Sequence, residues 1–309
     1  MVYASELFKP IIYAEDTTLL TSIRTAKAID KYKTESENIN IELSKVTTWL
    51  QLNKLSLNCE KTKAMIFHTP QRKVEYPQPT IGNHKIEYVN QFNFLGIILD
   101  SNLNWKYHAH YISNKLSRTL GIMNKLKQFL PTKVMLHIYN SLFLAHVNYG
   151  LFLWGWKSQN MGKLVKKAVR IIAKCKYNAH TSEIFKRFNL LKFEDLCALH
   201  DYKICYKLLN ALLPDYFLPT FNTVSQEQTG YATRISDKNL LKFPFIRHEY
   251  SKQSFIYRSI EIINSMKDCI KNKIYTHSFI GFKLYIKTII LSSYNVSCET
   301  PNCYVCQLT

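Results

Sequence analysis

The sequence predicts an α+β fold in which antiparallel strands and one long helix come first and a mainly helical region follows. Residues 9–20 (KPIIYAEDTTLL) hold two β-rich apolar runs around an acidic pair, which indicates a strand, a tight turn and a return strand. Within residues 22–54, apolar residues recur at spacings of four and three, which is typical of one face of a helix. From Trp105 onward the apolar pattern is again helical.

Local patterns predict the elements that lie between these landmarks. Residues 63–68 and Phe92–Leu99 are predicted strands, and Thr80–Glu87 is a predicted hairpin. The polar segment Pro70–Pro79 is predicted to be a loop. The later helical segments are predicted around Ile112–Met123 and at 131–147, 161–175 and 182–213, with shorter apolar and basic segments at 240–246, 254–266 and 276–291.

Composition restricts the class of protein and of partner. The chain has 309 residues, 47% of them hydrophobic and 20% charged, which is typical of a globular protein and not of a disordered one. Lys and Arg number 41 against 22 Asp and Glu, a formal net charge of +19. A charge of this size favours polyanionic partners, nucleic acid first and an acidic lipid surface second.

The cysteines and the apolar runs bear on location. The eight Cys show no regular spacing over most of the chain and no signal peptide is visible, so we expect reduced thiols in an intracellular protein, nuclear or cytoplasmic, and not a secreted one. The longest apolar stretch, Leu142–Trp154, is interrupted by His146 and Asn148. It is too short to cross a bilayer, so no membrane span is expected.

The predicted helix 161–175 carries the clearest charge pattern. Val165 and Ile172 belong to an apolar face, and basic residues follow the opposite face. The stretch Lys157–Ser182 contains no Asp or Glu. A basic stripe is often only the solvated face of a surface helix. The acid-free run favours a phosphate-contacting surface instead, and the residues assigned to it are Lys163, Lys166, Lys167, Arg170 and Lys174.

Five segments in order resemble one family. Tyr13-Ala14-Glu15-Asp16 is similar to the Tyr-Ala-Asp-Asp box of reverse transcriptases, and Trp49–Phe67 resembles the next block of the non-LTR retrotransposon polymerases. Phe94–Asp100 is similar to the primer-grip strand of that family. The two later landmarks are Asn148–Gly155 and Lys166–Ile172. The chain therefore resembles the carboxy-terminal portion of a jockey-like RNA-directed DNA polymerase, over about residues 9–290.

The resemblance implies a division of the chain into regions. Residues 1–104 would be the carboxy-terminal part of a polymerase palm, and residues 105–156 a thumb-like helical segment. A basic helical region would follow at 157–220, and a carboxy-terminal region with a cysteine-containing tail at 231–309.

The resemblance also implies a chemistry, which is two-metal nucleotidyl transfer on an RNA template and a DNA primer or duplex. Glu15 and Asp16 would be ligands of Mg²⁺ or Mn²⁺, with Glu15 in place of the expected Asp. An acidic pair at a turn is also an ordinary solvated feature. Lys61 would assist the departing pyrophosphate as a general acid or point charge, or is simply a turn lysine.

Two further assignments from the resemblance concern nucleic-acid contact. Tyr13 would lie against primer or template, and its alternative is a tyrosine in the core of the sheet. Phe94, Leu95 and Gly96 would contact the primer, and their alternative is sheet packing in which Gly96 permits close backbone approach.

A cysteine group near the carboxy terminus raises the question of zinc. Cys298, Cys303 and Cys306 are close in sequence, and a fourth ligand such as His277 would complete a tetrahedral site. The tail itself does not supply the fourth ligand, so a zinc site would need one from elsewhere in the chain.

Three functions remain open from the sequence. The first is a reverse-transcriptase fragment, expected to be inactive as this chain because the family's fingers and its other catalytic aspartate are not recognised before Glu15. The second is a remnant that binds nucleic acid without chemistry. The third is a basic helical scaffold or membrane-surface protein. Aromatic residues among the lysines favour nucleic acid over lipid, and these are Tyr107, Tyr111, Trp154, Trp156 and Tyr177.

Overall fold

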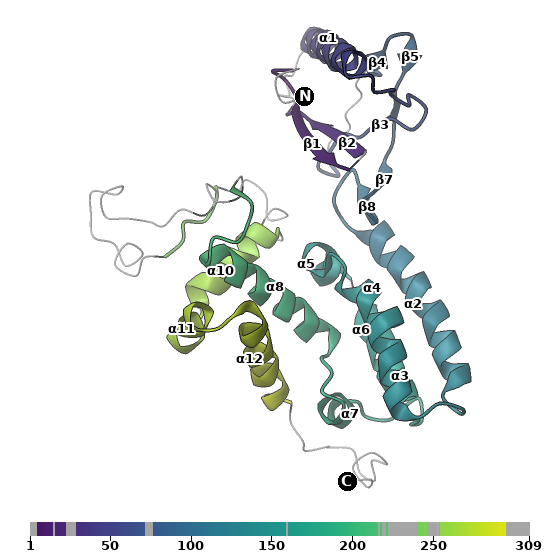
Figure 1. Ribbon diagram of the computed structural model, residues 1–309, viewed down its shortest axis with the longest axis vertical. Coiled ribbons are helices and arrows are strands. Elements are labelled where there is room, and N and C mark those ends of the chain that lie inside the picture. Colours follow the sequence, from purple (N-terminus) through teal and green to yellow (C-terminus); the bar gives the residue numbers. More distant parts are fainter. Residues whose placement is uncertain are drawn as a thin grey trace. The chain divides into compact units, whose positions relative to one another are not determined.

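The computed structural model in Figure 1 shows a mixed α/β chain in which helices predominate and the described sheets are small strand pairs. It describes residues 5–14, 16–22, 29–71, 77–158, 160–215, 217, 221, 240–245, 252 and 254–294. The chain divides into two compact units, residues 1–104 and 105–309.

The first unit begins with the predicted hairpin. Strand β1 (Lys9–Tyr13) pairs antiparallel with β2 (Asp16–Leu20), and the register places Tyr13 opposite Asp16. Ala14 at the turn has φ 49°, a left-handed conformation of the kind that two-residue hairpin turns require. The strand–turn–strand prediction is confirmed.

Helix α1 (Ile29–Leu52) is the long helix of the first unit. It ends two residues before the predicted bound at 54, and at the other end of the predicted range residues 23–28 lie outside the described residues. Val46 is buried in its predicted stripe, and the helix packs against β4 (Thr80–Ile81). The Asn40 side chain accepts a hydrogen bond of 2.8 Å from the backbone N–H of Thr80, which fixes β4 on the helix. The apolar face of the helix is therefore turned to the first unit, with Val46 buried and Ile39, Leu43 and Leu50 half-buried.

The remaining strands of the first unit are short. β4 turns through Gly82 into β5 (His84–Lys85), which confirms a hairpin within Thr80–Glu87. β3 (Lys63–Ala64) pairs in parallel with β6 (Glu87–Tyr88), and the predicted strand 63–68 ends at Ala64.

One predicted strand is wrong. Phe92–Leu99 is not a single strand but most of a second hairpin, formed by β7 (Gln91–Phe94) and β8 (Ile97–Asp100). Leu95 and Gly96 have φ 47° and 79°, so two consecutive left-handed residues reverse the chain. The apolar run hides this turn because Leu95, unlike Gly96, carries no turn signal.

The second unit is helical from Lys106 onward. The bounds are α2 (Lys106–Leu126), α3 (Thr132–Ile138), π-helix η1 (Tyr139–Leu144), α4 (Ala145–Asn148), α5 (Leu151–Trp154), 3₁₀-helix η2 (Gly155–Lys157), α6 (Met161–Ile172), α7 (Ser182–Arg187), α8 (Phe193–Leu209), α10 (Phe255–Ser265), α11 (Asp268–Thr276) and α12 (Phe279–Ser292). None of the described helices is long and apolar enough to cross a membrane.

Two helical predictions need correction. The predicted helix 131–147 contains a π-helical turn, η1, between α3 and α4. The predicted helix 182–213 is two helices, because Asn189 adopts a left-handed φ of 54° after α7 and α8 starts only at Phe193. The helical spacing of apolar residues continued through this break and concealed it.

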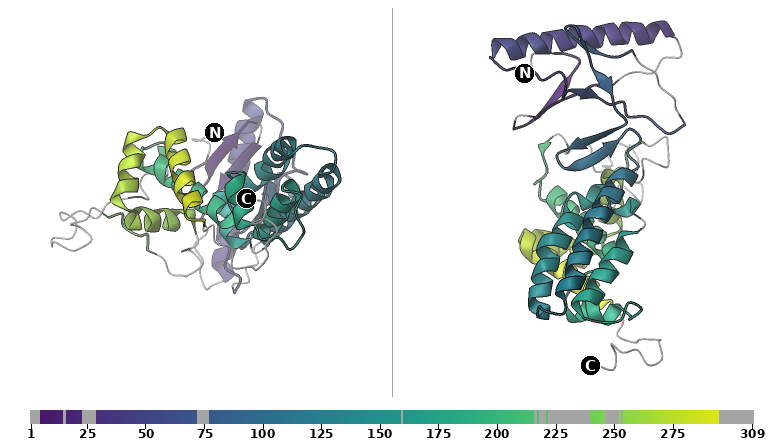
Figure 2. Two further views of the ribbon diagram at one scale, coloured as in Figure 1. Left: turned by 90° about the horizontal axis from the view of Figure 1, so that it is seen from below. Right: turned by 90° about the vertical axis from the view of Figure 1, so that its right-hand side faces the viewer.

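The core of the second unit lies among its helices. In α2, the predicted stripe Ile112, Leu116, Leu120 and Met123 is buried. Helices α2 and α6 pack against each other, and α8 packs against α10 and α12 (Figures 1 and 2). Trp154 is fully buried and its indole N–H donates to the Tyr149 carbonyl oxygen at 2.9 Å, so its polar edge is satisfied.

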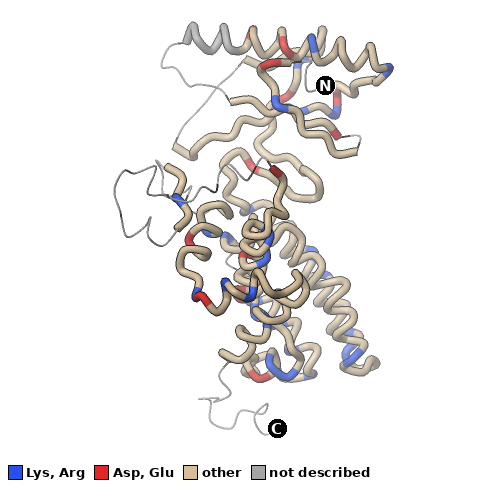
Figure 3. Tube along the Cα trace, turned by 60° about the vertical axis from the view of Figure 1, so that its left-hand side comes forward, with Lys and Arg blue, Asp and Glu red and all other residues tan. Residues whose placement is uncertain are grey.

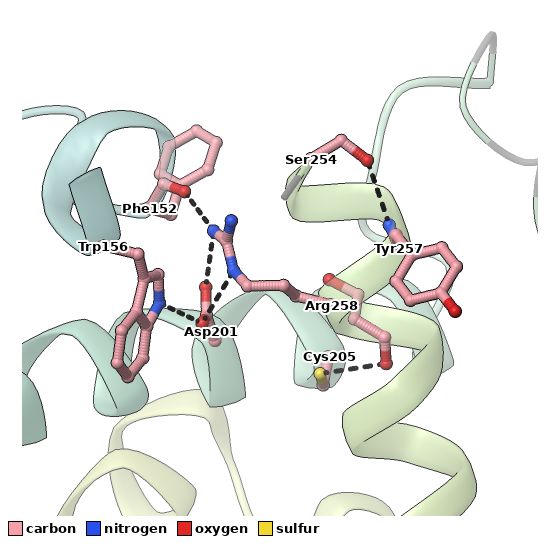
Figure 4. A network of polar contacts seen from close by, with 8 residues as sticks. Phe152, Trp156, Asp201, Cys205, Ser254, Tyr257 and Arg258 are labelled. Carbon is pink, nitrogen blue, oxygen red and sulfur yellow. Dashed lines mark hydrogen bonds and ion pairs between the residues drawn. The ribbon is translucent and has the colours of Figure 1, made fainter. Parts of the chain in front are cut away.

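A buried ion pair ties α10 to α8 (Figure 4). Asp201 on α8 is almost fully buried, and its two carboxylate oxygens accept from Arg258 of α10 at 3.3 Å each. The indole N–H of Trp156 donates to the same carboxylate at 2.7 Å, and Arg258 also donates to the carbonyl oxygen of Phe152. One carboxylate therefore holds segments from three parts of the chain.

Two histidines of this unit make stability dependent on pH. Burial lowers the pKa of His108 to about 4, and burial followed by the charges of Lys203 and Lys283 lowers the pKa of His200 to about 4. The unfolded chain takes up these protons near pH 6.5, so stability is complete above that pH and falls as the pH drops towards 4. We expect a loss of about 1.4 kcal/mol per pH unit for each histidine.

The measurement is urea unfolding of the full chain at neutral and at mildly acidic pH. His108→Phe should flatten the pH dependence, because a phenyl ring can keep the edge contact with Trp154, whose ring centroid lies 5.3 Å away. His110 is exposed, so His110→Phe is the matched control. It should leave the pH dependence of stability as in the wild type. Equal slopes for all three proteins would contradict the assignment.

Candidate nucleic-acid interface

The positive charge of the chain is concentrated in the second unit. Residues 1–104 contain 12 Lys and Arg against 11 Asp and Glu, whereas residues 105–309 contain 29 against 11. The first unit is thus almost neutral and the second carries nearly all of the net charge.

Within the second unit the charge is sharper still. Residues 101–182 contain no Asp or Glu and 13 Lys and Arg, so the acid-free run extends well before Lys157 and covers all of α2 to α6. Figure 3 shows the Lys and Arg positions along these helices in blue. No carboxylate of this run can neutralise its cations or repel a phosphate.

Helix α6 displays the predicted two-sided pattern. Val165, Ala168, Val169 and Ile172 are fully buried against the core. The side chains of the opposite face point to solvent, and the exposed cations of the helix are Lys163, Lys166 and Lys167. No ion pair of these three lysines is found in the described part of the chain. Their ammonium groups are available to phosphate oxygens.

Two of the predicted basic residues differ from the other three. Arg170 is partly buried, and its Nε donates to the Ala179 carbonyl oxygen at 2.8 Å, so it also anchors the segment after the helix. Lys174 lies beyond the helix end at Ile172 and has a left-handed φ of 56°. It is exposed, but it does not continue the basic face of the helix that was predicted over 161–175.

The aromatic residues expected among the lysines are unequal. Tyr177 is 89% exposed, and Tyr107 and Tyr111 on α2 are also exposed. Trp154 is in the core and cannot stack on a base, and the exposed Trp156 already uses its N–H on Asp201. Tyr177, next to the exposed Lys176, is the side chain best placed for base stacking.

The predicted polymerase residues lie in the first unit. Tyr13 is 64% exposed, so it is not a core tyrosine, and Asp16 opposite it is exposed as well. Glu15 lies outside the described residues. Asp16 is thus the carboxylate that the described hairpin offers to a metal ion.

A metal site was tested on the donors that are present. Two-metal transfer needs carboxylates from more than one strand to bridge both ions. Among the described residues no group of three or more His, Cys, Asp or Glu side chains comes together. The described donors therefore do not fit a two-metal site by themselves.

Lys61 is exposed and lies in a turn after α1. Its backbone N–H donates to the Asn58 side chain at 3.1 Å, and Thr62 donates twice to the Asn58 carbonyl oxygen. Among the described residues no hydrogen bond or ion pair joins Lys61 to Asp16. The local geometry is that of a turn lysine.

Phe94 is the last residue of β7, and Leu95 and Gly96 form the β7–β8 turn instead of continuing a strand. Leu95 is exposed at the tip, and Gly96 is needed for its positive φ. The turn, and not close packing in a sheet, explains this glycine.

Sequence reasoning missed Asp100, which is only 2% exposed. Its Oδ1 accepts from the backbone N–H groups of Asn102 and Asn104 at 3.1 Å each. An Asp side chain that accepts a hydrogen bond from the backbone two residues later forms an Asx-turn. The signal in the sequence was a single carboxylate at the end of an apolar run. Asp100 shapes the segment that leads to α2.

Two of the described thiols, Cys197 and Cys205, are buried in the core of the second unit. Burial raises the pKa of both Cys197 and Cys205 to about 12, so they remain protonated thiols. Cys298, Cys303 and Cys306 lie outside the described residues, so the zinc site predicted there also falls outside them. His277 is described, and its Nδ1 lies 3.1 Å from the Thr276 hydroxyl.

Comparison with known protein families gave no match, and neither the curated proteins nor the solved structures gave one.

Proposed function

We propose that this chain binds nucleic acid through the cations of residues 105–309, and that it derives from the carboxy-terminal portion of a non-LTR retrotransposon reverse transcriptase. The observation that carries the first part is the run 101–182, with 13 Lys and Arg and no Asp or Glu. The five segments that resemble the family, from Tyr13–Asp16 to Lys166–Ile172, support the second part.

Nucleic acid fits this surface better than a membrane does. An interfacial helix needs a broad apolar face towards the acyl chains, together with basic residues beside it. In α6 the apolar face is fully buried in the core, so only the lysine face remains for a partner. Exposed tyrosines near lysines, such as Tyr177, add stacking partners that bases use and lipids do not.

The direct test is binding of the full chain to fluorescent single-stranded RNA, to duplex DNA and to vesicles of phosphatidylcholine and phosphatidylserine. We expect both nucleic acids to bind, with dissociation constants of about 10⁻⁶ M at moderate salt. This is the tight-binding end of the range for sequence-independent binding. Binding to the vesicles without binding to RNA or DNA would refute the proposal.

Polymerisation is the second function to test, because Asp16 stands at the start of β2 as in the resembled box. We expect no template-dependent primer extension by this chain with Mg²⁺ or Mn²⁺. Glu15→Asp alone should not create primer extension. Two-metal transfer needs carboxylates from more than one strand, and this hairpin supplies only one adjacent pair. Extension that Asp16→Ala abolishes would contradict this expectation.

A further inference from the structure

A second cluster of cations lies away from α6, where helices α8 and α12 pack together. Lys203 and Lys207 stand four residues apart on α8, and Lys283 and Lys287 stand four residues apart on α12. Residues four apart share one face of a helix, so each helix presents a pair of ammonium groups. We name these four residues the α8–α12 lysine cluster.

The lysines of this cluster are close enough to act on one another. Burial, and then the charges of Lys283 and Lys207, lower the pKa of Lys203. Burial, and then the charge of Lys283, lower the pKa of Lys287. Lys283 of α12 therefore acts on Lys203 of α8 across the helix contact. Lys203 and Lys287 are half-buried.

No ion pair among the described residues relieves this repulsion. Helix α12 contains no Asp or Glu. On α8, Asp201 is engaged by Arg258, and Glu194 and Asp195 lie in the first turn, about two turns before Lys203. Within the described part of the chain, none of the four lysines forms an ion pair. Like charges four residues apart destabilise a helix, so the cluster has a cost that a bound anion would remove.

We propose that the α8–α12 lysine cluster is a phosphate-binding site at which the backbone of a nucleic acid crosses α8 and α12. The ligand assignment rests on the function proposed above. The recessed position of Lys203 and Lys287 suits a compact phosphate, which meets cations from two helices at once. Lys207 also lies over the Phe279 ring, 5.7 Å from its centroid, which helps to hold its stem beside the site.

An acidic lipid surface is the alternative that the test must separate. Ile280 and Leu284 on α12 are 69% and 56% exposed, close in sequence to Lys283. A membrane would use these apolar side chains together with the lysines, whereas a phosphate backbone needs the lysines alone. Ile280→Ser with Leu284→Ser should therefore weaken binding to a membrane and leave binding to a phosphate backbone unchanged.

The experiment measures binding of short single-stranded RNA to the full chain, with Lys203→Gln and Lys283→Gln combined. We expect affinity to fall about tenfold and the slope of log affinity against log salt to become shallower by about 1.4, at roughly 0.7 per lost phosphate contact. Without RNA, this variant should melt at or above the wild-type temperature, because a repulsion has been removed. The matched control, Lys186→Gln with Lys267→Gln, should bind within about twofold of the wild type.

The outcomes separate this inference from the proposed function. Unchanged RNA affinity of the cluster variant, in a chain whose wild type binds RNA, overturns the site alone. An equal loss in the control variant also overturns it, because the effect would then be one of net charge. Failure of the wild type to bind RNA overturns the proposed function. Vesicle binding that is lost on Ile280→Ser with Leu284→Ser, while RNA affinity stays unaffected by the cluster variant, assigns the lysines to lipid and overturns the inference.

Discussion

Charge reversal of Lys163, Lys166 and Lys167 to Glu is expected to lower the affinity of the full chain for single-stranded RNA by about a hundredfold. All three side chains are exposed on α6, opposite its buried apolar face. Each change removes a charge-assisted contact of about 1 kcal/mol or more and places a carboxylate against phosphate. Fluorescence anisotropy at constant salt measures the effect.

The variant leaves out Arg170 by design, because its hydrogen bond to Ala179 makes it a structural residue as well. The matched control reverses Lys186, Lys242 and Lys267, which are exposed lysines of the same unit outside α6. The control changes net charge by the same amount and should retain most of the affinity. If both triple variants lose affinity equally, α6 is not a specific contact surface. Circular dichroism should show that both remain folded.

Asp201→Ala is expected to destabilise the chain by about 3–5 kcal/mol, the range found when one partner of a buried ion pair is removed. The change leaves the Arg258 guanidinium partly buried without its counter-charge and removes the acceptor of the Trp156 N–H. Three chain segments then lose their common anchor. Urea denaturation measures the free energy of unfolding.

Two companion variants make this prediction sharper. Asp201→Asn keeps an oxygen for the Trp156 N–H and loses the charge, so we expect an intermediate loss. Asp268→Ala removes an exposed carboxylate at the start of α11 and should cost within about 0.5 kcal/mol. A loss below about 1 kcal/mol in Asp201→Ala would show that the network in Figure 4 does not stabilise the unit.

Elements with a strong periodic pattern could be predicted from the sequence. The stripe Ile112–Met123 in α2 and the two-sided α6 depend on spacing within one helix, and both are buried or exposed as expected. The β1–β2 hairpin could also be predicted, because its turn residues lie between two apolar runs. Local physics determines these elements.

Other features depend on contacts between distant residues, and a local pattern does not contain them. Asp201 and Arg258 are 57 residues apart, and no spacing rule pairs them. The Leu95–Gly96 turn is disguised by its apolar neighbours, and Asn189 interrupts a helix whose apolar spacing continues.

The candidate interface was half predictable for the same reason. The lysines of α6 follow from one helical period, but the α8–α12 lysine cluster combines residues such as Lys203 and Lys283 that are 80 positions apart in the numbering. Trp154 was expected near the lysines and is instead in the core. The sequence alone does not distinguish an aromatic side chain that packs in a core from one that stacks on a base.

The most direct test of nucleic-acid binding by this chain is the salt dependence of its affinity for single-stranded RNA. Dissociation constants are measured for the full chain between about 50 and about 200 mM salt. With about six phosphates contacted, the log–log slope should be about −4, at roughly −0.7 per phosphate, and the α6 triple variant should have a slope shallower by about 2. Binding with a slope near zero, or an unchanged slope in the triple variant, would contradict an interface built from the cations of residues 105–309.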